Sequence, residues 1–413
     1  MQYFTFLGMG KDGKYNDLLT SFKEEELSLK TPFVQEAIYK KHKSQINEVC
    51  IFLTPKAREL TYPVFKERFS EWPVTIIDIS DNCSFEEFIP LLIENIRDEK
   101  IIVDVTHCFR SIPIRLLMAM TYAEQMKNTK IDHIYYGQMF SDPRQEVVIE
   151  DIIKDYQLQK VSVYLSEFND TLAISSSNWE IAAEQNKEIK RFLKAMTDFN
   201  RMIELCEFAN AVKCVTNIVR QAKNIRNKPD QYTLLVPMVN KIIDKLEKCT
   251  EGSLRHQKAE LIRLLLKHRK YQIAATFTDQ FFREELIGKL VLKRGIASFE
   301  ELMDEYPFLR HYEDSFAYKF SQYLMNCELA MDGSNKKDNS GVEQKFNRLF
   351  DRGLFNQQDI DQLYNRFDVE ADREAVNNFF KNYRNKLNHG QSIQDSKGLE
   401  EIIYKVLDIT ESL

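Results

Sequence analysis

The feature that most constrains the fold is a change of pattern along the chain. Residues 2–155 alternate short runs rich in β-branched and aromatic residues with amphipathic segments, whereas beyond about residue 165 the apolar residues recur only three and four positions apart. The first pattern is typical of parallel strands joined by crossover helices, and the second of helices packed on helices. The sequence therefore predicts a Rossmann-like α/β domain with a parallel sheet over residues 1–165, followed by an all-α region over residues 166–413.

Individual strands and helices can be assigned from the same pattern. The strand candidates are QYFTFLG, EVCIFLT, VTIIDIS, KIIVDVT and IDHIYYG, with EVVIEDI as an edge strand added by a hairpin. Helices are predicted over residues 56–69, 84–99 and 111–126 of the first domain, and over 178–221, 235–249, 271–291 and 372–387 of the second. Residues 334–341, SNKKDNSG, are polar and rich in turn formers, so we expect a loop there.

Composition limits the class of protein. A chain of 413 residues exceeds what one hydrophobic core usually organises, and 43% hydrophobic residues suffice for packed cores. The net charge of −6 argues against a basic coat for duplex DNA but leaves RNA open. The seven cysteines form no C-x-x-C pair, so we expect reduced thiols and neither a zinc site nor any other metal site. No signal pattern or membrane-length apolar run occurs, so we expect a soluble cytoplasmic protein without a membrane partner.

Two loops follow predicted strands at the edge where parallel sheets bind ligands. In LGMGKDGKY, Gly8 and Gly10 allow the backbone to approach a ligand closely, and Lys11 suits an anion. The third glycine of G-x-G-x-x-G is missing, and a plain tight turn is the alternative.

The second loop is VDVTHCFRSIPI, residues 103–114. Thr106 and His107 leave the sheet, Ser111 can cap the following helix, and Arg110 can grip a phosphate. A capped helix N-terminus with these neighbours is an anion cradle. The alternative is an ordinary strand-to-helix turn with a structural histidine and a solvated arginine.

A third group of polar residues lies late in the chain, in FFKNYRNKLNHGQ. Arg384, Asn385 and His389 fall off the apolar stripe of a predicted helix. Asn385 and His389 share a face, but Arg384 is about 140° round the helix from His389. Both can reach one phosphate if Gly390 ends the helix, or if two chains meet about a two-fold axis.

These residue types suit the cleavage of RNA without a metal. A helix C-terminus favours a protonated imidazole, which can transfer protons near neutral pH, and a fixed guanidinium stabilises charge on a phosphate. On this reading His389 is the acid-base residue, Arg384 the phosphate clamp and Asn385 the orienting residue. Chance spacing of an arginine and a helix-capping histidine is the alternative.

The run Asp104-Val105-Thr106-His107, followed by Arg110 and Ser111, resembles the D-x-T-H-G signature of the CRISPR-associated Rossmann-fold (CARF) proteins of type III systems. FLGMG and the strand end YYG, which closes on Gly137, are similar to other loops of that family. Cys108 replaces the family's glycine, which leaves the ligand's path through this loop open. We expect Cys108 to be an ordinary small residue, with a thiol nucleophile as the alternative.

Arg384-Asn385-x-x-x-His389 resembles the R-x(4-6)-H motif of HEPN ribonucleases. A CARF half followed by a HEPN half is the architecture of type III CRISPR ancillary ribonucleases. The resemblance implies a homodimeric, metal-independent endoribonuclease for single-stranded RNA, activated by cyclic oligoadenylate and needing no cofactor. The expected activator-binding residues are Gly8, Gly10, Lys11, Thr106, His107, Arg110, Ser111 and Gly137.

Two other functions fit the same residues. The first domain alone could degrade cyclic oligoadenylate as a ring nuclease, with the helical region serving to dimerise the chain. Alternatively, the protein is a non-enzymatic, nucleotide-sensing regulator, although no helix-turn-helix with a basic recognition helix is recognisable. Neither the ring size of the activator nor the RNA sequence preference follows from these patterns.

Overall fold

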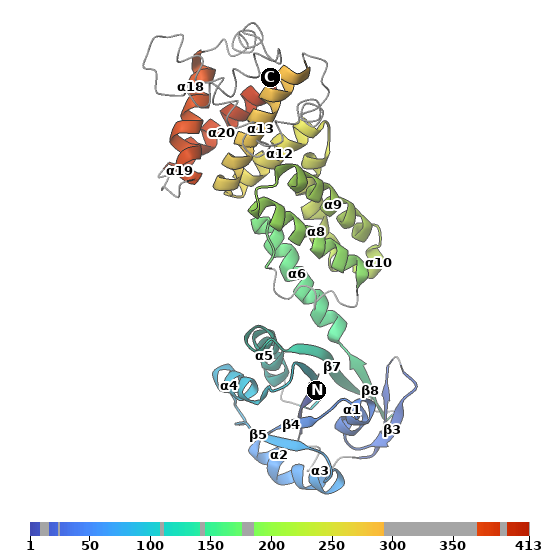
Figure 1. Cartoon of the computed structure of the whole chain (residues 1–413). Helices are drawn as coiled ribbons and strands as arrows, with labels where there is room; N and C mark the ends of the chain where they lie inside the picture. The colour runs from blue at the N-terminus through green and yellow to red at the C-terminus, as the bar shows by residue number, and fades with distance from the viewer. Residues whose placement is uncertain are drawn as a thin grey trace. The chain divides into compact units, whose positions relative to one another are not determined.

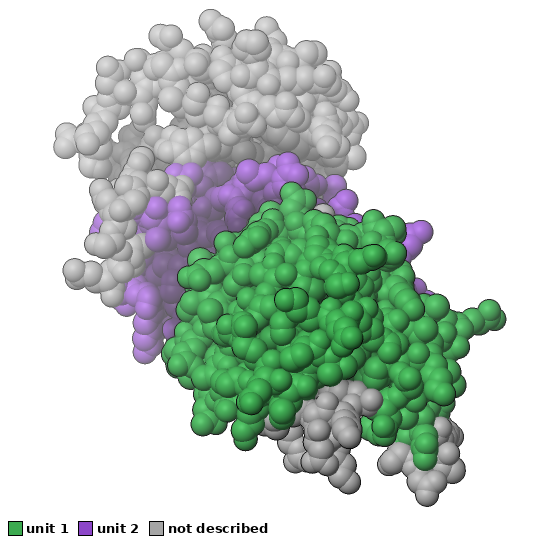
Figure 2. All heavy atoms as spheres, turned by 90° about the horizontal axis from the view of Figure 1, so that it is seen from below, with its two compact units in different colours: residues 1–160 green, residues 161–413 purple. Residues whose placement is uncertain are grey.

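The computed structural model describes residues 1–8, 16–23, 25–107, 111–140, 145–175, 186–292, 370–388 and 395–412 (Figure 1). The chain forms two compact units, Met1–Lys160 and Val161–Leu413, which are coloured separately in Figure 2. The boundary falls inside helix α6 (Ile153–Thr171). The boundary expected from the sequence, at residue 165, falls in the same helix.

Unit 1 is built on one sheet of eight strands in the order β3-β2-β8-β7-β6-β1-β4-β5. The strands are β1 (Gln2–Phe6), β2 (Leu18–Phe22), β3 (Ser28–Thr31), β4 (Glu48–Leu53), β5 (Val74–Asp78), β6 (Lys100–Asp104), β7 (Lys130–Phe140) and β8 (Glu146–Asp151). Strands β7, β6, β1, β4 and β5 run parallel to one another. β8 returns antiparallel along β7, β2 pairs parallel with β8, and β3 closes the sheet antiparallel to β2.

The sheet is therefore mixed, where the strand pattern predicted a parallel one. EVVIEDI does form the predicted hairpin strand, but β8 is not at the edge of the sheet because β2 and β3 lie beyond it. β2 and β3 were not predicted, since they are short and mostly half-exposed and thus lack the continuous apolar runs of the central strands.

Helices cover both faces of the sheet. The helices among the described residues of this unit are α1 (Val34–His42), α2 (Pro55–Leu60), α3 (Tyr62–Arg68), α4 (Phe85–Asn95), α5 (Ser111–Lys127) and the first turns of α6. The segment predicted as one helix over 56–69 is two helices, because Thr61 ends α2 and Pro63 opens α3 at a position where a missing N–H costs nothing.

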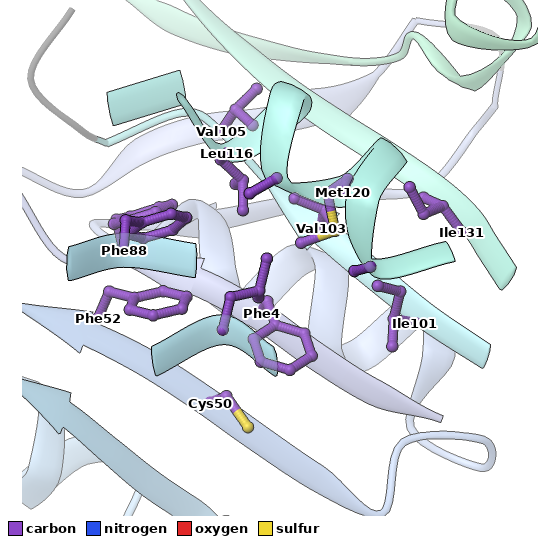
Figure 3. Close-up of a cluster of buried hydrophobic side chains, with 14 of the residues drawn as sticks. Phe4, Cys50, Phe52, Phe88, Ile101, Val103, Val105, Leu116, Met120 and Ile131 are labelled. Atoms are coloured by element: carbon purple, nitrogen blue, oxygen red, sulfur yellow. The ribbon is translucent and has the colours of Figure 1, made fainter. Parts of the chain in front are cut away.

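Two hydrophobic cores result from this arrangement. α1, α2 and α3 bury their apolar residues with Tyr3, Ile51 and Ile102 of the sheet. On the opposite face, Phe88 of α4 and Leu116 of α5 pack on the alternate strand residues, as Figure 3 shows. Residues that alternate along a strand thus face different cores.

The described residues of unit 2 form helices joined by turns and short connections, and no strand occurs among them. Its elements after α6 are α8 (Lys187–Glu204), α9 (Phe208–Arg226), α10 (Pro229–Tyr232), α11 (Val236–Leu246), the 3-10 turn η1 (Glu247–Thr250), α12 (Leu254–Lys267), α13 (Tyr271–Leu292), α18 (Glu370–Asn378), the π-helical turn η4 (Phe379–Arg384), α19 (Asn385–Asn388) and α20 (Ser396–Ser412). An α/β domain followed by a helical one is thus confirmed. The loop expected at residues 334–341 lies outside the described residues.

Among the helices that the structure describes, none is both long and apolar enough to cross a membrane.

Candidate functional site

The carboxyl end of β6 carries a buried carboxylate. Asp104 is fully buried, and its Oδ2 accepts hydrogen bonds from Thr5 Oγ1 at 2.7 Å and Tyr3 OH at 3.3 Å. Its Oδ1 accepts from the backbone N of Thr106 at 2.9 Å and from Thr106 Oγ1 at 2.5 Å. Burying a charge is costly unless it is hydrogen-bonded, and these four donors meet that requirement. Burial, together with the nearby carboxylate, raises the pKa of the Tyr3 hydroxyl, which keeps it a donor.

Thr106 extends this network to the next strand. Its Oγ1 accepts the backbone N–H of Gly137 in β7 at 2.8 Å. A Cβ atom on Gly137 would lie 2.9 Å from Thr106 Cγ2 and 3.3 Å from Val147 Cγ1, so a side chain does not fit here without displacing its neighbours. The structure thus brings Thr106 and Gly137 together, and glycine permits this close approach.

A glutamine of α1 links the end of strand β1 to the same network. Gln35 is completely buried and donates to Phe6 O at 2.8 Å and Thr5 Oγ1 at 3.2 Å. Its own Oε1 has no hydrogen-bond partner among the described residues. Beyond β1, Gly8 O accepts a hydrogen bond from Thr61 Oγ1 at 3.0 Å. β1 and β6 are neighbouring parallel strands, so their carboxyl ends lie at the same edge of the sheet, which is the edge where open α/β sheets bind ligands.

His107 follows directly after this network and is partly buried. Burial lowers the pKa of its imidazole, an effect that Asp104 opposes. A histidine kept neutral in this way can donate from one ring nitrogen and accept at the other.

The remaining predicted ligand residues are described only in part. Gly10, Lys11 and Arg110 lie outside the described residues. Ser111 is the first residue of α5, at the helix end expected to face an anion, but its side chain is not described.

In unit 2, Arg384 is anchored by a residue far away in the sequence. It ends η4, and its Nε donates to Oδ2 of Asp279 in α13 at 2.8 Å. Asp279 is buried, and its other oxygen accepts from Arg283, one turn further along α13. The Arg283 guanidinium lies 4.9 Å above the ring of Phe380. Two arginines therefore share one buried carboxylate, and an aromatic ring packs against one of them.

The helical stripe expected around Arg384 is present, with a local change of pitch. Val376, Phe379 and Phe380 are buried, while Tyr383 and Leu387 are partly buried. The π-helical turn over Phe379–Arg384 is rarer than an α-helical one and occurs often at functional sites. Asn385 begins α19, but its side chain is not described, and His389 and Gly390 lie outside the described residues.

Sequence patterns did not reveal how several residues of these networks are connected. Asp104 belongs to the quoted motif, but nothing in the sequence reveals that it accepts four hydrogen bonds. Asp279 and Arg283 are two charged residues four apart in FTDQFFR, a run with three phenylalanines, and such a pair on a buried helix was the available signal. Arg384, which donates to Asp279, lies 105 positions away from it, and sequence spacing cannot reveal this pairing.

Unit 1 is thus an α/β domain with a polar, hydrogen-bonded site at the carboxyl edge of its sheet, and unit 2 carries an anchored arginine. Comparison with known proteins finds a likeness to CRISPR-associated protein MJ1674 of Methanocaldococcus jannaschii, with 24% identity over 166 residues. The match covers 40% of this chain and 25% of that protein, so it spans a quarter of the relative's length. No protein-family model matches the chain.

Proposed function

We propose that this chain is a CRISPR-associated endoribonuclease with a Rossmann-like CARF half and a HEPN half. Cyclic oligoadenylate binds to the first and activates cleavage of single-stranded RNA by the second. The likeness to a protein named as CRISPR-associated supports the broad assignment. The two motifs quoted from the sequence, in the order that this architecture requires, support the finer one.

The observation that carries the sensing role is the network around Asp104. Its hydrogen bonds fix Thr106 at the carboxyl edge shared by β6 and β1, and the bond from Gly137 to Thr106 adds β7. An oligonucleotide ring carries several phosphates and adenines, and a site assembled from several strand ends presents donors over a wide area. Arg110 and the N-terminus of α5 are the groups that we assign to the phosphates.

The cleavage role rests on Arg384 and His389. Asp279 holds the guanidinium through Nε, which fixes the plane of the terminal nitrogens with which arginine grips a phosphate. His389 transfers protons to and from the 2′-hydroxyl and the leaving oxygen. Because the ribose supplies its own nucleophile, the reaction needs no metal, and its products end in 2′,3′-cyclic phosphate. A homodimer brings two such pairs into one groove.

One observation favours a second candidate. An arginine paired with a buried aspartate is also what a purely structural arginine looks like, and Arg384 is only 18% exposed. In that case unit 2 would be a non-catalytic module of a nucleotide-sensing regulator.

A cleavage assay separates the two candidates. The full chain is mixed with a fluorescent single-stranded RNA and with cyclic oligoadenylates of each ring size, with and without EDTA. The proposal predicts cleavage that depends on one ring size, persists in EDTA and is absent for a 2′-deoxy substrate. No cleavage with any ring, by a protein that does bind one, would favour the regulator.

A further inference from the structure

A polar groove of about 540 Å³ runs between α8 and α9 in unit 2. α8 contributes Arg191, Lys194 and Asp198, and α9 contributes Asn217, Arg220 and Gln221. The three residues of α8 are three, four and seven positions apart, and on α9 Arg220 and Gln221 lie three and four positions after Asn217, so each set forms one stripe. The groove therefore follows the seam of a helix pair whose apolar residues are buried elsewhere on the same helices.

The groove is positive although the chain is acidic overall. α9 contains four basic residues and no acidic one. Three cations line the groove, Arg191, Lys194 and Arg220, against the single carboxylate of Asp198. Glu188 on α8 does not pair with these three cations. It forms an ion pair with Lys228 and accepts a hydrogen bond from the Tyr232 hydroxyl at 2.8 Å.

The polar groups of the groove are partly pre-organised. Arg220 donates to Asn217 Oδ1 at 2.8 Å, and Gln221 donates to the same oxygen at 3.3 Å. Arg191 and Lys194 are exposed and form no ion pair with another described residue. An arginine held by an amide loses less freedom when it binds a phosphate, and exposed cations can release counterions to a polyanion.

This chemistry fits a phosphodiester chain. Guanidinium and ammonium groups bind phosphate oxygens, whereas the amides of Asn217 and Gln221 both donate to and accept from ribose hydroxyls and base edges. We propose that the α8–α9 groove binds the backbone of single-stranded RNA on helices that carry no proposed catalytic residue. The choice of RNA among polyanions rests on the proposed function.

The test measures binding rather than cleavage. Full-length protein carrying His389→Ala, which leaves RNA intact, is titrated into a fluorescent single-stranded RNA at several salt concentrations. The groove variant adds Arg191→Gln, Lys194→Gln and Arg220→Gln. A matched control removes three exposed lysines of the same unit that do not line the groove, Lys241→Gln, Lys248→Gln and Lys267→Gln.

If the groove binds RNA, its variant should lose at least about tenfold in affinity at low salt. The slope of log affinity against log salt should fall by about two, since three phosphate contacts contribute about 0.7 each for single strands. The control should bind as the parent does. Equal loss in both variants, or none in either, would overturn the proposal. Because binding is the readout, a protein that binds RNA here but never cleaves it refutes the proposed function and leaves the groove standing.

Discussion

Thr106 shows at the residue scale how one side chain joins two strands of the sheet, β6 and β7. Its hydroxyl donates to the buried Asp104 and accepts from the backbone of Gly137, and its own backbone N–H is held by the same carboxylate. Each hydrogen bond to a charged group contributes about 1.5–3 kcal/mol, so this threonine is firmly placed. The chain that follows Thr106, which we assign to activator binding, therefore starts from a fixed position at the end of β6.

Substituting Gly137 by alanine should disturb this point. The new methyl group would lie 2.9 Å from Thr106 Cγ2, so Thr106 must move. We expect Gly137→Ala to weaken binding of the activating cyclic oligoadenylate by about tenfold, or about 1.4 kcal/mol, in a calorimetric titration.

The matched variant is Gly137→Ala with Thr106→Ser. Serine keeps the hydroxyl but removes the methyl group that collides, so part of the lost affinity should return. Unchanged affinity in the single variant, or no recovery in the double one, would show that Thr106 does not position the activator.

At the scale of elements, a buried ion pair joins η4 to α13. Two arginines share Asp279, but their surroundings differ: Arg283 is itself buried and packs on Phe380, whereas Arg384 is more exposed at 18%. We therefore assign Arg283 to stability and Arg384 to the phosphate.

Lysine substitutions can separate these two roles, because lysine keeps the charge but not the planar fork. Arg384→Lys should reduce activator-dependent RNA cleavage at least about a hundredfold, with a change of less than about 1 kcal/mol in unfolding free energy. Arg283→Lys should lower stability by about 1–3 kcal/mol, because packing on Phe380 is lost, and should retain cleavage. The reverse pattern would mean that Arg384 is structural.

α1 is joined to β7 by a histidine that titrates abnormally. His42 Nε2 and Tyr135 OH are 2.7 Å apart, and the ring of His133 lies 4.7 Å from that of His42. Burial, followed by repulsion from His133, lowers the pKa of His42 to about 4. Since the unfolded chain protonates this histidine near pH 6.5, the native state should lose stability as the pH falls from about 6.5 to 4.

Replacing His42 by glutamine should flatten this dependence. The slope of unfolding free energy against pH should fall by up to about 1.4 kcal/mol per pH unit, the value for one proton. Trp72, stacked on Tyr39 at 3.9 Å, reports on unit 1 by fluorescence if Trp179→Phe is present in every variant. His256→Gln, at an exposed position of α12, is the control. An unchanged slope in His42→Gln would contradict the assignment.

Local patterns predicted some elements and not others. The central strands were found because residues such as Ile101, Ile102 and Val103 are buried on both faces and give a continuous apolar run. The hairpin of β2 and β3 has no such run. The contact of Thr106 with Gly137 depends on the pairing of β6 with β7, whose register shifts at Ile101/Ile102, and no local pattern reveals such an irregularity. The bond from Arg384 to Asp279 likewise depends on packing between distant helices.

At the scale of the whole molecule, activator binding at the proposed sensing site has to act on the rest of the chain. Within unit 1, α5 begins where the proposed activator loop ends, and it is tied to the first turns of α6. Glu124 of α5 is buried and accepts from Tyr156 OH and Lys160 Nζ, both at 2.7 Å. A displacement of α5 by the activator would therefore act on α6, which contains the boundary between the units.

We propose that unit 1 binds the activator and unit 2 cleaves RNA, which makes them two distinct, coupled sites. This division of roles is tested by measuring activator affinity and RNA cleavage together on two variants. Arg110→Ala removes a proposed phosphate contact, so it should bind activator about tenfold more weakly, need more of it, and still cleave RNA at saturation. His389→Ala should bind activator nearly as the parent does and cleave no RNA. Unchanged affinity in Arg110→Ala, or persistent cleavage by His389→Ala, would contradict the account.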